Sequence, residues 1–94
     1  MNSSKSIVYA VNENWANDGN EDSAVTLFYS KTDAIKHLNE LSEEDSKDGI
    51  TSRICDCINF VCDRTENSYD CYLEGDYNTH HYTIDIEEKD TVAL

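Results

Sequence analysis

The chain of 94 residues contains no proline and three glycines, Gly19, Gly49 and Gly75. A phosphate-binding loop needs glycines close together, so P-loop and dinucleotide-binding chemistry is excluded. The chain also lacks the run of about 18 apolar residues that a membrane-spanning helix needs. Its first six residues are polar and do not have the pattern of a signal peptide. We therefore expect a cytoplasmic protein that does not bind membranes.

Positive charge is also scarce. Seven Lys and Arg face 20 Asp and Glu, which gives a net charge of −13 at pH 7. Residues 6–30 and 65–88 contain no Lys or Arg. A surface this acidic repels nucleic acid and attracts cations or basic protein surfaces. Ordinary surfaces intersperse both signs, so the long single-sign stretches indicate a selected field; the alternative is that the acid serves solubility alone.

The four cysteines do not match a metal or redox motif. Cys55 and Cys57 form one close pair, but Cys62 and Cys71 do not supply the second pair of a structural zinc site. A Cys-x-x-Cys redox motif is absent. Cytosolic thiols stay reduced. We therefore predict free thiols, no metal and no cofactor.

The stretch from Ser30 to Gly49 has the pattern of an amphipathic helix. Ser30 suits the N-cap and Gly49 suits the C-terminal stop. Four apolar residues recur at helical spacing and are expected to pack on a sheet: Ala34, Ile35, Leu38 and Leu41. Beyond them the same face turns acidic. The last turns are therefore expected to project carboxylates into solvent, namely Glu43, Glu44, Asp45 and Asp48.

Four segments have the composition or alternation of β-strands, and they are residues 6–12, 24–29, 50–63 and 81–88. In the last of them Tyr82, Ile84 and Ile86 point to one side of the sheet. Asp85 and Glu87 point to the other side, about 7 Å apart from a rise of roughly 3.3 Å per residue. That spacing is close to the spacing of successive phosphates in a nucleic-acid strand.

The remaining segments are assigned with less regular patterns. Residues 14–23 are polar and predict a loop, with Trp15 either folded back over the sheet edge or exposed as an anchor for a partner. Residues 65–75 favour a short helix by their i, i+3, i+4 spacing, although they also alternate as a strand would. Residues 89–94 predict a frayed tail.

The order is strand, strand, helix, strand, short helix, strand. Packing both helices on one face of a sheet is the economical arrangement for such an order. The sequence therefore predicts a single α+β domain over residues 1–94, with a mostly antiparallel four-stranded sheet. The length leaves no room for a second domain.

In size, charge and cytosolic character, the chain resembles the small acidic inhibitors made by phages and mobile elements. Anti-CRISPR proteins and other nucleic-acid mimics belong to that class. The segments VYAV, VTLFYSK followed by DAIKHL, and GDYNTHHYTIDI are similar to those of small phage and gut-bacterial proteins. The resemblance implies an inhibitor that blocks a nucleic-acid-binding enzyme by offering carboxylates in place of phosphates.

The absence of a catalytic motif argues against an enzyme. The expected partner is a basic surface of a nucleic-acid-binding protein, and the expected contact residues are Glu43, Glu44, Asp45, Asp48, Asp85, Glu87, Glu88 and Trp15. Two alternatives stay open at this point. One is a small adaptor that homodimerises through its sheet edge, and the other is a metal or small-molecule binder.

Overall fold

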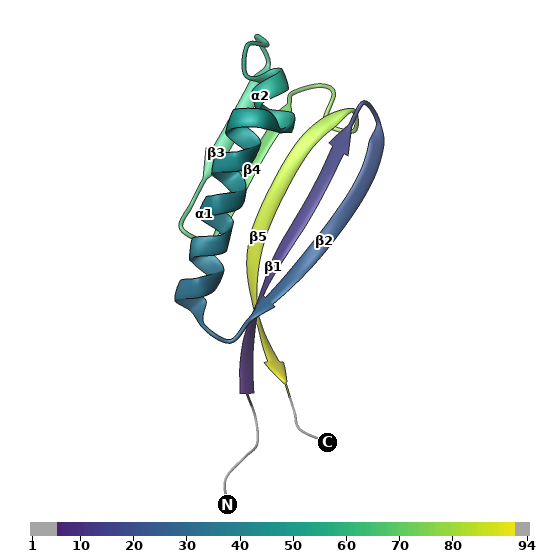
Figure 1. Cartoon of the computed structure of the whole chain (residues 1–94). Coiled ribbons are helices and arrows are strands. Elements are labelled where there is room, and N and C mark those ends of the chain that lie inside the picture. Colours follow the sequence, from purple (N-terminus) through teal and green to yellow (C-terminus); the bar gives the residue numbers. More distant parts are fainter. Residues whose placement is uncertain (1–5, 92–94) are drawn as a thin grey trace, which may run out of the picture.

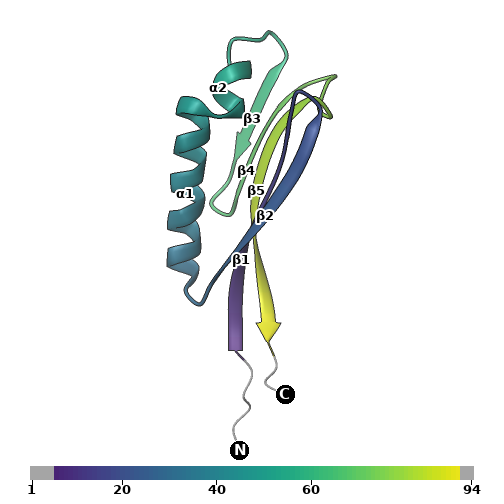
Figure 2. The same cartoon turned by 45° about the vertical axis from the view of Figure 1, so that its right-hand side comes forward.

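The structure, a computed structural model, describes residues 6–91. Five antiparallel strands form one sheet in the order β2-β1-β5-β4-β3, and two helices cover one of its faces (Figures 1 and 2). The elements are β1 (Ser6–Asn17), β2 (Asn20–Phe28), α1 (Lys31–Asp48), α2 (Ile50–Ile54), β3 (Phe60–Arg64), β4 (Ser68–Leu73) and β5 (His80–Thr91). The α+β class and the antiparallel sheet are confirmed, but the predicted sheet was one strand short.

The first two strands form a long hairpin rather than two short strands joined by a loop. Asp18 and Gly19 have positive φ angles of 55° and 83°, and Asn17 pairs directly with Asn20. Positive φ at both central residues is what a two-residue type I′ turn requires, and Asp-Gly suits it well. Residues 14–23, predicted as a loop, therefore continue the two strands.

The predicted third strand begins instead with a helix. Residues 50–54 form α2, and the strand β3 starts at Phe60. Residues 65–75, for which a helix was favoured, contain the strand β4. Tyr69 and Cys71 alternate on its inner side and pair with Ile84 and Tyr82 of β5, so the strand period is the one that buries them.

The core lies between α1 and the covered face of the sheet. Ser30 caps α1, because its Oγ accepts a hydrogen bond from the Asp33 N–H at 3.3 Å. Ala34 and Leu38 are fully buried, while Ile35 and Leu41 are half-buried. On β5, Ile84 is buried and Asp85 is exposed, which confirms the predicted register of that strand.

The C-terminal strand is longer than predicted. β5 pairs with β1 as far as Thr91, so residues 89–91 belong to the sheet and not to a frayed tail; residues 92–94 lie outside the described part. Neither helix within residues 6–91 combines the length and apolar character needed to cross a bilayer.

Two of the four cysteines are bonded to each other. Cys62 of β3 stands directly opposite Cys71 of β4, with Cα atoms 4.1 Å apart, and the two form a disulfide. Cys55 and Cys57 are free and exposed. The prediction of four free thiols is therefore wrong for one pair, because the helix assigned to residues 65–75 concealed the strand register that brings the two sulfurs together.

Candidate functional site

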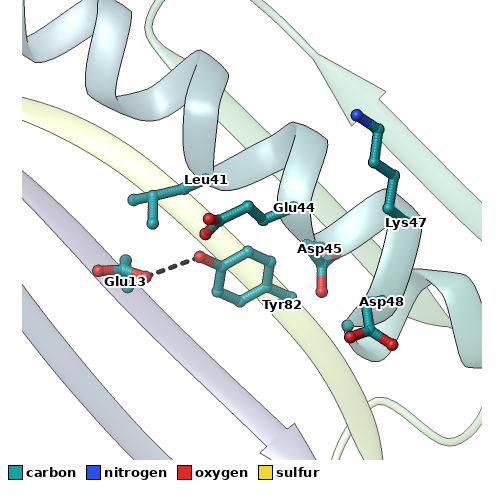
Figure 3. A pocket seen from close by; sticks show the side chains of 8 residues that line it. Glu13, Leu41, Glu44, Asp45, Lys47, Asp48 and Tyr82 are labelled. Atoms are coloured by element: carbon teal, nitrogen blue, oxygen red, sulfur yellow. Dashed lines mark hydrogen bonds between the residues drawn. The ribbon is translucent and has the colours of Figure 1, made fainter.

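A groove of about 550 Å³ lies between the C-terminal half of α1 and the strands β1 and β5 (Figure 3). Its lining residues are Glu13, Leu41, Glu44, Asp45, Lys47, Asp48, Gly49 and Tyr82. A smaller hollow shares the Glu13 and Tyr82 end of this lining and adds Trp15 and Ile50. The two hollows together form an acidic groove with an aromatic and aliphatic floor, which we call the acidic groove.

The periods of the strand and the helix place these side chains. Glu13 and Trp15 lie on the inner side of β1, directly opposite Ile84 and Tyr82 of β5. Leu41, Glu44 and Asp48 are three, four and seven residues apart, so they share one face of α1. The acid of the last helical turns is thereby brought over the inner face of β1.

Tyr82 and Glu13 form the polar centre of the groove. The Tyr82 hydroxyl donates a hydrogen bond of 2.7 Å to the Glu13 carboxylate, as Figure 3 shows. Burial, and then the hydrogen bond and charge of Glu13, raise the pKa of Tyr82 far above its usual range. Tyr82 therefore stays a neutral hydrogen-bond donor to Glu13.

The carboxylates of the groove outnumber its cations. Glu44 and Asp48 are exposed at the rim, and Figure 3 shows the Lys47 ammonium pointing away from both. Trp15 is half-buried at the other end, with its ring edge toward Tyr82 at 6.2 Å between centroids. The groove thus offers negative charge above an apolar floor.

Asp45 does not belong to the exposed acid. It is 7% exposed, and its carboxylate accepts hydrogen bonds from the Ile50 N–H at 2.7 Å, the Thr51 hydroxyl and N–H, and the Tyr69 hydroxyl at 3.3 Å. It therefore satisfies the first donors of α2. A side chain at Gly49 would collide with this carboxylate. The prediction that Asp45 projects into solvent is wrong, because α2 was not recognised.

The other predicted contact residues are divided between the faces of the molecule. Glu44 and Asp48 line the acidic groove, whereas Glu43 lines a hollow on the β3 side of α1 with Arg64. Asp85 and Glu87 lie on the uncovered face of the sheet, where both accept hydrogen bonds from the Asn12 amide, at 3.2 and 3.4 Å. They therefore share no surface with the groove.

Glu88 and Trp15 lie elsewhere than the sequence indicated. Glu88 lies on the covered side of β5, beside Lys31 and Tyr9. Trp15 is neither folded over a sheet edge nor fully exposed, since β1 carries it into the groove. The eight predicted residues therefore do not form one surface, and a partner with a flat surface can contact one part of the set at a time.

Sequence reasoning missed Glu13 and Tyr82 as site residues. The signal for Glu13 was its position: extending the alternation of β1 through Val11, Glu13 and Trp15 places a carboxylate on the apolar side of the strand. That extension depends on recognising the Asp18-Gly19 turn. Tyr82 was correctly placed on the same side of the strand as Ile84, but its hydroxyl partner lies 69 residues away in the chain.

The described residues of the groove do not form a metal site. Within residues 6–91, no group of three or more His, Cys, Asp or Glu side chains is placed to hold a metal ion. No protein-family model matches the chain, and no curated protein or solved structure matches it. The class that the fold and the groove define is a small, strongly acidic α+β domain with a recess lined by carboxylates.

Proposed function

We propose that this protein is an acidic interaction protein that inhibits a nucleic-acid-binding enzyme, in the manner of anti-CRISPR proteins, by occupying its basic groove. The acidic groove carries the proposal. Glu13, Glu44 and Asp48 come together from two elements over apolar surface. A Lys or Arg side chain that normally holds a phosphate fits such a recess, because its head binds carboxylates and its aliphatic stem packs on apolar side chains.

Internal cations leave most of the acid uncompensated. In the described part of the chain, Lys89 forms an ion pair with Glu87 at 3.7 Å, and the His80 Nε2 lies 3.2 Å from an Asp18 carboxylate oxygen, where an ion pair requires a protonated His80. With a net charge of −13, the molecule has a field that steers a basic surface toward it. An exposed ion pair contributes only about 0.2–1 kcal/mol, so binding also needs apolar anchors, for which Leu41 and Trp15 in the groove are placed.

The proposed role is binding and not catalysis, and the proposed location is the cytoplasm, where nucleic-acid-binding enzymes are found. Glutathione and thioredoxin keep cytosolic thiols reduced. The Cys62–Cys71 bond would accordingly be open in that compartment and closed in an oxidising one. The acidic groove does not contain either cysteine, so the proposal does not depend on the redox state.

Paired baits test the proposal. The wild-type chain and the variant Glu13→Gln/Glu44→Gln/Asp48→Asn would each be immobilised in a phage-infected bacterial lysate, and the bound proteins identified by mass spectrometry. The variant loses three charges, while the amide oxygen introduced by Glu13→Gln still accepts the Tyr82 hydrogen bond. We expect the wild type to enrich a nucleic-acid-binding protein that the variant loses.

A matched control separates the groove from total charge. Asp56→Asn/Glu66→Gln/Glu74→Gln removes the same charge from exposed positions outside the groove. It should capture the same protein as the wild type. Equal capture by all three baits would contradict the role of the groove, and equal loss from both variants would show that charge acts without it.

A further inference from the structure

β2 is an edge strand without the usual protection. No element lies along its outer side within the described residues, as Figure 1 shows. Proteins normally shorten edge strands or place charges on them to prevent pairing with other chains. The opposite edge, β3, follows this rule: it has five residues and ends in Asp63 and Arg64. β2 has nine residues, and the segment 23–30 has no charge.

The hairpin geometry determines which backbone groups face outward. Residues that flank a two-residue turn exchange both hydrogen bonds, and Asn17 and Asn20 are the residues that flank this turn. Every second residue from Asn20 therefore bonds to β1. The residues between them direct their N–H and C=O groups away from the sheet, and they include Val25 and Leu27.

The outward donors of β2 differ in whether a side chain occupies them. The Asp22 carboxylate accepts a hydrogen bond of 2.8 Å from the Ser23 N–H, which occupies one outward donor near the turn. Val25 and Leu27 have no such side-chain partner among the described residues, and their side chains are each 60% exposed. Tyr29, which follows, is 85% exposed. Open backbone groups and exposed apolar side chains thus coincide.

We propose that this part of β2 is a docking site for a second copy of the chain, added antiparallel so that one sheet continues through both molecules. Charge selects this occupant and orientation. Antiparallel addition places the two acidic hairpin ends, each with Glu21 and Asp22, at opposite ends of the interface between the two copies. Parallel addition would set them side by side, where like charges repel.

One register brings opposite charges together as well. When Val25 stands opposite the second copy's Leu27, Glu21 stands opposite the second copy's Lys31, and the same pair repeats at the other end. Ser30 is extended, with φ −113° and ψ 129°, so the chain keeps the strand direction up to Lys31. The apolar side chains then form cross-strand pairs on the uncovered face.

The docking site and the acidic groove are independent. The groove is lined by residues of α1, β1, β5 and the α1–α2 junction, and β2 does not contribute to it. The two kinds of binding also respond oppositely to salt. Screening weakens the attraction between the groove and a basic partner, but it relieves the repulsion between two chains of charge −13.

Sedimentation of the purified chain tests the docking site, at low salt and at about 1 M salt, where the Debye length is roughly 3 Å. We expect a dimer that is tighter at high salt. Leu27→Lys should weaken dimerisation at least about tenfold, because it places a charge in the interface between the two β2 strands. Val25→Pro should do the same by removing an outward N–H while the bonds to β1 remain.

The control is Asn14→Lys, which adds the same charge at an exposed position of the uncovered face away from the edge. It should dimerise as the wild type does. Circular dichroism identifies any variant that fails to fold. Leu27→Lys and Val25→Pro disrupt the interface by different means, so either of them alone tests the proposal if the other does not fold. The proposal would be overturned if the wild type were monomeric at both salt concentrations, or if folded Leu27→Lys and Val25→Pro both dimerised as the wild type does.

Discussion

At the scale of single residues, the carboxylates of α1 have two different roles. Asp45 is buried and bonded to the start of α2, whereas Asp48, one turn further on, is exposed. Hydrogen bonds to a charged group contribute more than neutral ones, and removing a buried acceptor leaves its donors unsatisfied. The same residue type therefore stabilises the fold at one position and supplies the surface field at the other.

Replacing Asp45 tests this difference. Asp45→Ala should lower the free energy of unfolding by about 2–3 kcal/mol, because the Ile50 and Thr51 donors lose their acceptor. Asp48→Ala should change it by less than about 0.5 kcal/mol, as is usual for an exposed side chain. Urea denaturation of both variants measures the two values. Equal, small losses would show that α2 does not depend on the carboxylate.

A second residue-scale prediction concerns Asp70 on the uncovered face. Burial of its carboxyl group, and then the charge of Asp63 directly opposite on β3, raise the pKa of Asp70; His81 acts in the other direction. One carboxyl oxygen of Asp70 is buried without a hydrogen-bond partner in the described structure. The ionised form is thus disfavoured in the folded chain.

The sign of the pH dependence follows. Because the folded pKa lies above the unfolded one, the favourable contribution of protonated Asp70 is complete at low pH and is lost as the pH rises through the folded pKa. Asp70→Asn should therefore raise the thermal midpoint at pH 7. The gain should disappear below the usual aspartate pKa of about 3.9. A thermal midpoint that falls at pH 7, or a gain in midpoint that is the same at both pH values, would contradict the conclusion that the ionised form of Asp70 is disfavoured in the folded chain.

At the scale of elements, local patterns predicted some segments well. The boundaries of α1 follow from Ser30 and Gly49, and the register of β5 follows from its alternation, because both depend on nearby residues. The hairpin extension was also accessible from the sequence, since Asp18-Gly19 is a strong turn signal. It was missed because the flanking residues are polar, and polarity was taken to indicate a loop.

Other elements depend on partners distant in the chain. α2 starts at Ile50 because the Asp45 carboxylate accepts hydrogen bonds from the first N–H groups of this helix. Nothing within residues 50–54 alone indicates that the helix starts there. β4 alternates as a strand because Tyr69 and Cys71 reach the core formed by β5 and α1. The acidic groove shows both cases. The carboxylates on its helical side were predicted, whereas the residues on its sheet side could be placed only after β1 was seen to extend to Asn17.

The β3–β4 pair gives an element-scale prediction. The disulfide closes a loop with a sequence separation of nine, and closing so short a loop stabilises by about 2–3 kcal/mol in the chain-entropy model. Reductant should therefore lower the thermal midpoint while the chain stays folded. Cys62→Ser should already have the lower midpoint and should not respond to reductant. Four reactive thiols in the denatured, unreduced protein would show that the bond is absent.

At the scale of the whole molecule, the main feature is how the negative charge is distributed over the surface. The molecule extends 57 × 22 × 18 Å, so carboxylates on α1 and on the uncovered face act in different directions. Glu44 and Asp48 face a recess, while Asp85 and Glu87 lie on an open sheet bonded to Asn12. In the proposed function, the groove is the acidic surface that encloses a single basic side chain, and the remaining carboxylates act at longer range.

The most direct measurement is competition between this protein and nucleic acid for the captured partner. A labelled oligonucleotide bound to that partner would be titrated with the wild type and with the groove variant Glu13→Gln/Glu44→Gln/Asp48→Asn. We predict that the wild type displaces the oligonucleotide, that the variant needs at least about tenfold more protein, equivalent to about 1.4 kcal/mol, and that displacement weakens with salt. An oligonucleotide that stays bound in a large excess of wild-type protein would contradict the proposed inhibition.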